Sequence, residues 1–207
     1  MKKAIILSGL FIALSASFVS AQGINMALVD CSAGGTVNAP MNLCTSSAGL
    51  ALSMVGSCFP PAGLNRVVAC EGYIDGQTAA PVLSPWWTLD GCRAAALSYS
   101  FDFLAGPYNC NDFWAGLAAG GGAISPIHTA PNRFQIKLVG ATVAENPIDP
   151  GLEHYLFKVN ITRTKSAGVG ECVGCDESAC LVLNRLVINQ PAGVGDATLT
   201  TPMYGNF

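Results

Sequence analysis

Residues 153–164 read EHYLFKVNITRT, and their side chains alternate between apolar and polar with Leu156 as the one exception. Successive side chains of an extended strand point to opposite faces, so this period of two predicts a strand with one buried face. The apolar face carries Tyr155, Phe157, Val159 and Ile161, and the polar face carries His154, Lys158, Asn160 and Thr162. The stretch therefore predicts half of a buried interface, which a second layer must cover.

Strands of this kind recur along the chain. Residues 133–138 and 97–103 alternate as clearly. Weaker patterns predict strands at 24–30, 49–57, 65–75 and 180–190, of which 180–190 is apolar on both faces and is expected at the centre of a sheet. Only residues 112–119 suggest a helix, a short one capped by Asp112. Together the strands predict an all-β fold, an antiparallel β-sandwich of the jelly-roll or immunoglobulin-like type.

The N-terminal residues resemble a secretory leader. Lys2 and Lys3 precede an apolar run up to about Val19, and the small residues Val19-Ser20-Ala21 form a cleavage site. The run is short for a transmembrane anchor and is interrupted by serine and glycine. We expect a signal peptide at 1–21, a sandwich domain at 22–190 and a C-terminal tail at 191–207. The mature chain is then secreted, either extracellular or periplasmic, without stable membrane insertion.

The charge of the chain argues against a nucleic-acid partner. Without Lys2 and Lys3, eight basic residues face thirteen acidic ones, for a net charge of about −5 with both histidines neutral. Binding to phosphates needs clustered basic side chains, which this composition does not supply.

Nine cysteines follow the leader, and an oxidising compartment favours disulfides. Proximity in sequence suggests the pairs Cys31–Cys44, Cys58–Cys70 and Cys92–Cys110. The remaining three are Cys172, Cys175 and Cys180, so four disulfides and one thiol are expected, with the unpaired cysteine in this trio. A zinc site would need His154 as a fourth ligand, and a redox Cys-x-x-Cys would need a helix N-terminus, so structural disulfides are favoured and no metal or cofactor is expected.

Four segments resemble a family of secreted bacterial proteins of uncharacterised activity. They are PPAGLN at 60–65, FDFLAGPYNCNDFWAG at 101–116, PNRFQIKL at 131–138 and YLFKVNITRTKSAGVGECVGCDESACLVLN at 155–184. The resemblance implies a shared β-sandwich. It implies no activity, cofactor or catalytic residue.

Four aromatic residues are the candidates for ligand binding, namely Trp86, Trp87, Tyr108 and Trp114. Adjacent tryptophans in a strand face opposite sides, so one of Trp86 and Trp87 would reach solvent and offer a platform for a sugar ring. The alternative is that the tryptophans plug the ends of the sandwich.

Catalytic candidates are few. His128 and His154 are the only histidines, and no Gly-x-Ser-x-Gly elbow accompanies them. Asp102 and Asp112 are the best pair for a glycosidase, which needs two acids that flank a cleft. We therefore expect a non-enzymatic binding or surface-structural domain whose partner is a glycan or another extracellular surface. A polysaccharide hydrolase and a self-associating subunit of an extracellular assembly are the alternatives.

Overall fold

The computed structural model describes residues 22–28, 31, 44–103, 110–126 and 130–203. The expected leader, Tyr108 and His128 lie outside these residues. The described chain is all-β: it contains no helix, and so none long and apolar enough to cross a membrane.

Within the described residues, nine strands form two antiparallel sheets. Sheet A has the order β1-β2-β7-β4 and sheet B the order β5-β6-β3-β8-β9. Sheet A consists of β1 (Gly23–Leu28), β2 (Leu52–Phe59), β7 (His154–Ile161) and β4 (Leu97–Ser100). Sheet B consists of β5 (Ala119–Pro126), β6 (Arg133–Pro147), β3 (Arg66–Thr78), β8 (Ala179–Asn189) and β9 (Ala197–Leu199).

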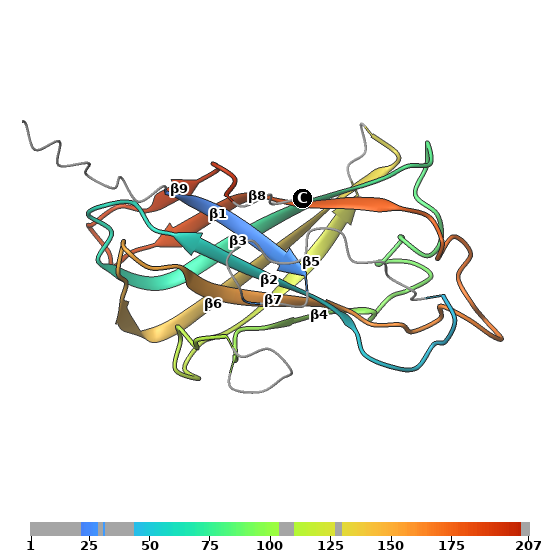
Figure 1. Ribbon diagram of the computed structural model, residues 1–207, viewed down its shortest axis with the longest axis horizontal. Helices are drawn as coiled ribbons and strands as arrows, with labels where there is room; N and C mark the ends of the chain where they lie inside the picture. The colour runs from blue at the N-terminus through green and yellow to red at the C-terminus, as the bar shows by residue number, and fades with distance from the viewer. Residues whose placement is uncertain (1–21, 29–30, 32–43, 104–109, 127–129, 204–207) are drawn as a thin grey trace, which may run out of the picture.

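The two sheets pack face to face as a disulfide-braced β-sandwich, and their strands cross at an angle in Figure 1. Phe157 of β7 reaches across to β3. Its ring occupies the space that a side chain at Gly72 would fill. Sheet A contributes Met54, Val159 and Ile161 to this core, and sheet B contributes Ile74, Ile136 and Leu186. The prediction of the fold class is confirmed.

All seven predicted strands are present, although β4 is shorter than 97–103 and β6 continues to Pro147. Two strands, β5 and β9, were not predicted from the sequence. The run Gly120–Gly122 of β5 resembles a loop in sequence, yet it pairs with β6 because Tyr99 and Phe101 occupy the space its missing side chains leave. The helix predicted at 112–119 is wrong: residues 113–116 form turns, and β5 begins at Ala119.

The sandwich extends beyond residue 190, so the predicted boundary of a separate tail is too early. After β8 the chain returns as β9 in sheet B, and it then crosses to sheet A. There Ile24 of β1 donates a backbone hydrogen bond to Thr201 and accepts one from Met203. The segment 197–203 therefore joins the edges of both sheets.

Three disulfides connect cysteines that are distant in sequence: Cys31–Cys110, Cys44–Cys175 and Cys92–Cys172. The three pairings predicted from sequence proximity are wrong, because an antiparallel sandwich brings loops from distant parts of the chain to the same end. Three cysteines are free rather than one. Cys58 and Cys70 are buried in the core, and Cys180 of the predicted trio is exposed.

Candidate functional site

The tryptophans predicted to bind ligand are buried. Trp86, Trp87 and Trp114 are 1%, 2% and 0% exposed, which leaves no indole face for a sugar. Trp86 and Trp87 lie in a turn rather than a strand, so both enter the core, with ring centroids 4.8 Å apart. Their prediction as a binding platform is wrong for this reason. Their burial agrees with the alternative, that the tryptophans plug the ends of the sandwich.

Each indole N–H has a protein acceptor. Trp86 donates to Ser166, Trp87 to the carbonyl of Glu177 and Trp114 to the carbonyl of Leu156. The buried guanidinium of Arg93 lies 3.8 Å from the Trp86 ring centroid. Burial lowers the pKa of Arg93 to about 10. The contacts of Trp86, Trp87 and Arg93 tie together the loops at one end of the sandwich, whereas Trp114 is bound near the start of β7.

Of the predicted acid pair, Asp112 has a structural role in its own turn. Asp112 uses both carboxylate oxygens within its own turn, where Oδ1 accepts from the Trp114 N–H and Oδ2 from the Gly116 N–H. Asp102 is exposed. Burial lowers the pKa of Lys158, and the charges of Asp102 and Asp112 oppose this effect without outweighing it. Asp112 thus terminates a loop in the way capping residues do. His154 is likewise structural, because its Nε2 contacts the backbone of Asp149 and its ring meets Phe113 edge-on.

The structure instead gathers polar side chains on the outer surface of sheet B, which we call the polar face. Side chains alternate along β3, β6 and β8, so that those pointing outward form this face and those between them enter the core. The polar face comprises Glu71, Tyr73, Asp75 and Gln77 of β3, Arg133, Gln135 and Lys137 of β6, and Cys180, Val182, Asn184 and Arg185 of β8.

A bulge in β8 enlarges this face. The register with β3 shifts between Tyr73 and Ile74, so Asn184 and Arg185 are both exposed, and Leu186 returns to the core. The expectation that 180–190 is apolar on both faces is wrong, because it assumed unbroken alternation. The bulge reverses which positions face outward after Asn184.

A shallow hollow of about 270 Å³ lies at one end of the polar face. Its lining is Asp75, Gly76, Gln77, Arg133, Cys180, Val182 and Asn184. The Asp75 carboxylate accepts 2.7 Å hydrogen bonds from Gln135 Nε2 on one oxygen and from Asn184 Nδ2 on the other. Arg133 of β6 lies directly opposite Gln77 of β3, and its Nε donates a hydrogen bond to Gln77 Oε1 at 2.9 Å. The side chains of three strands are thus held by one another.

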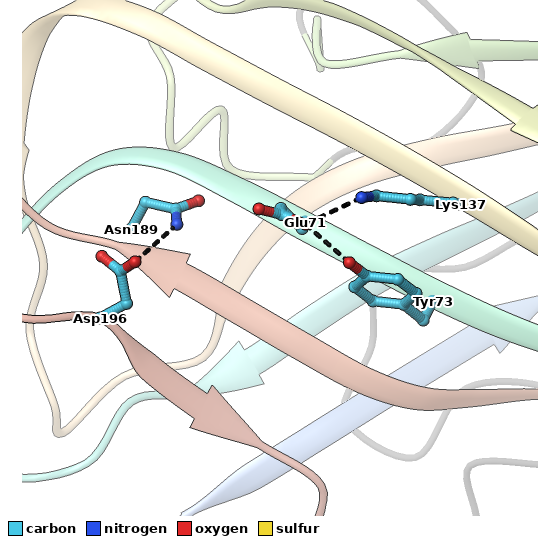
Figure 2. A network of polar contacts seen from close by, with 5 residues as sticks. All are labelled: Glu71, Tyr73, Lys137, Asn189 and Asp196. Carbon is cyan, nitrogen blue, oxygen red and sulfur yellow. Dashed lines mark hydrogen bonds and ion pairs between the residues drawn. The ribbon is translucent and has the colours of Figure 1, made fainter.

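A clamp around Tyr73 continues the polar face beyond the hollow. Tyr73 pairs directly with Lys137 on β6 and Arg185 on β8, whose charged atoms lie 5.2 and 3.7 Å from its ring centroid. Figure 2 shows its hydroxyl and Lys137 converging on Glu71, at 2.7 and 3.3 Å. These partners, the Tyr73 hydrogen bond first, lower the pKa of Glu71.

The same view contains a third contact, between Asn189 and Asp196, which joins the end of β8 to the turn before β9 (Figure 2).

The groups around Tyr73 and those of the hollow differ in their capacity for a ligand. Two cations contact the Tyr73 ring and its hydroxyl donates to Glu71, so Tyr73 already has partners within the protein and holds the side chains of the polar face in place. The groups of the hollow retain capacity for a ligand. They present the Nη groups of Arg133, the Nε2 of Gln77 and the carbonyl oxygen of Asn184.

This arrangement suits a small ligand rich in hydroxyl groups. Planar amides, a carboxylate and a guanidinium exchange paired hydrogen bonds with such groups, and side chains already fixed lose little entropy on binding. No metal-binding group of His, Cys, Asp and Glu is found among the residues that the structure describes. The alternation of Arg133, Gln135 and Lys137 with buried residues was visible in the sequence. Its cross-strand partners were not.

Comparison with known proteins identified no relative of the chain. No family model, curated protein or solved structure matches the chain. The function proposed below therefore rests on the chemistry of the chain itself.

Proposed function

We propose that the protein is a secreted, non-catalytic binding domain that takes a glycan on the polar face of sheet B. The observation that carries the proposal is Asp75, which accepts an amide hydrogen bond on each oxygen and lines the hollow. Hydroxyl groups of a sugar can both donate to a carboxylate and accept from an amide or guanidinium.

The form of the surface supports a carbohydrate over a compact apolar ligand. Small-molecule cavities typically span about 300–1,000 Å³ and are enclosed, whereas this hollow has about 270 Å³ and lies on an open sheet surface. Val182 and Cys180 line it beside the polar groups. A chain of sugar units could extend from the hollow along β3 without entering the core.

A glycan array followed by calorimetry on the best ligand tests the proposal. Asp75→Asn keeps the shape of the side chain and removes its charge, and charge-assisted hydrogen bonds contribute about 1.5–3 kcal/mol, so we expect affinity to fall at least about tenfold. Asp90→Asn is the matched control, because Asp90 is exposed in the loop between Trp87 and Arg93 and outside the polar face. Absence of binding by the wild type to every glycan tested would refute the proposal.

A second candidate is a subunit of an extracellular assembly, and the observation in its favour is the exposed free thiol of Cys180. β9 pairs with β8 only at Leu186–Ile188, so the stretch of β8 near Cys180 has no strand on that side among the described residues. A disulfide-linked dimer on a non-reducing gel that Cys180→Ser abolishes would support assembly. A monomer under oxidising conditions would refute this thiol-linked form.

A further inference from the structure

The polar face concentrates positive charge in an acidic chain. The whole sequence carries ten lysines and arginines against thirteen acids, for a net charge of −3. The polar face has the opposite balance, because Arg133, Lys137 and Arg185 outnumber Glu71 and Asp75. Charge of this sign at a binding surface favours an anionic ligand.

The two acids of the face are already engaged by other residues. Glu71 is held by Tyr73 and forms an ion pair with Lys137 at 3.3 Å. Asp75 accepts from the neutral amides of Gln135 and Asn184. Neither carboxylate is ion-paired with Arg133.

Arg133 is an exposed guanidinium whose partner within the face is neutral. Its Nε donates to the amide oxygen of Gln77, the residue directly opposite it across β3 and β6. Arg66–Glu145 and Lys137–Glu71 are ion pairs, and neither involves Arg133. The anchoring through Nε leaves both Nη groups for a ligand in the hollow that Arg133 lines.

We infer that the hollow binds an acidic sugar unit, with the Nη groups of Arg133 on its carboxylate and with Asp75 and the neighbouring amides on its hydroxyl groups. The planar fork of a guanidinium matches the two oxygens of a carboxylate. This inference rests on the proposed glycan binding and specifies its ligand class.

The spacing along the sheet suits one sugar ring. Asp75 and Gln77 are two residues apart on β3, about 6.6 Å at the usual rise of a strand, and Gln77 holds Arg133 beside it. A sugar carboxylate bound at Arg133 therefore places the sugar ring over Asp75. The carboxylate of the sugar then lies away from the like charge of the Asp75 carboxylate. Sulfate esters share the negative charge but not the planar geometry, so they form a separate arm of the test.

The test compares polygalacturonate with its fully methyl-esterified form, which has the same backbone without the charge, and with dextran sulfate. We expect the wild type to bind the acid at least tenfold more tightly than the ester. Arg133→Gln should bring this ratio close to one, because it should weaken binding of the acid far more than binding of the ester. Arg133→Lys should retain part of the preference, because it keeps the charge and loses the fork.

Arg66→Gln is the matched control, since Arg66 is an exposed arginine on β3 that is paired with Glu145 away from the hollow. It should keep the full preference. Equal binding of acid and ester by the wild type, or a preference that survives Arg133→Gln, would overturn the inference while glycan binding stands. Equal Arg133-dependent binding of dextran sulfate would overturn the assignment to a carboxylate. Failure to bind any glycan would remove the proposed function itself.

Discussion

The ring of Phe157 lies over the Cα of Gly56, the residue directly opposite it in the antiparallel pair of β2 and β7. Gly76 and Phe134 have the same relationship in sheet B. In each sheet a phenylalanine ring fills the space above a cross-strand glycine. These positions require glycine because of packing, and neither has a positive φ.

Gly56→Ala should destabilise the fold. The added Cβ would overlap the Phe157 ring, and overpacking of this kind costs about 1–3 kcal/mol. Gly121→Ala on β5 is the control, because a Cβ there meets no atom within 4 Å. Urea unfolding of the three proteins measures both effects. A Gly56→Ala protein as stable as the wild type would contradict the packing described.

Alkylation should find three thiols in the denatured, unreduced protein, at Cys58, Cys70 and Cys180. In the native protein we expect only Cys180 to react, because burial disfavours the reactive thiolate. Burial raises the pKa of Cys70 to about 12 and raises that of Cys58 further. Mass spectrometry of the labelled peptides gives the count. A single labelled thiol after denaturation would instead show that Cys58 and Cys70 are bonded.

Trp114→Ala should lower the free energy of unfolding. The side chain is fully buried, and truncation of such a residue costs about 3–5 kcal/mol. Trp114→Phe retains much of the volume but leaves the Leu156 carbonyl without its donor, so a smaller loss is expected. Leu117→Ala, a nearby side chain that is 56% exposed, serves as the control in thermal unfolding. Binding at the polar face by the folded fraction should be unchanged, and a selective loss of binding would restore a ligand role for Trp114.

Tyr99→Phe should change how stability depends on pH. The Tyr99 hydroxyl is buried with no hydrogen-bond partner, and burial raises its pKa to about 12. A pKa above the unfolded value of about 10 means that its contribution is fully present below about pH 10 and is lost as the pH rises through the folded value.

The variant should therefore match or exceed the wild type in unfolding free energy at neutral pH, since removal of an unsatisfied hydroxyl relieves a desolvation cost. Above about pH 10 its stability should decline less steeply. Urea titrations at a series of alkaline pH values measure the difference. Parallel curves for the two proteins would show that Tyr99 ionises as freely in the folded state as in the unfolded one.

Local pattern predicted seven of the nine strands found among the described residues, although on β7 the expected polar position Lys158 is buried as well. The alternation at 153–164 identified β7 and the core positions Phe157, Val159 and Ile161, because side-chain direction in a strand depends only on the parity of the position. The same rule failed at Asn184, where a bulge changes the parity, and at Gly120–Gly122, where glycines form a strand because aromatic rings pack against them. Adjacent tryptophans were misjudged because they lie in a turn.

The sequence by itself therefore determined an all-β sandwich and a polar outer surface, since both follow from interactions between near neighbours along a strand. The tertiary structure alone decided which loops meet, and hence the three disulfides, whose cysteines are 79, 131 and 80 residues apart. It also decided the candidate site, because Asp75, Arg133 and Asn184 come from three strands that only sheet pairing places side by side. Such contacts depend on the register between strands, which no local pattern encodes.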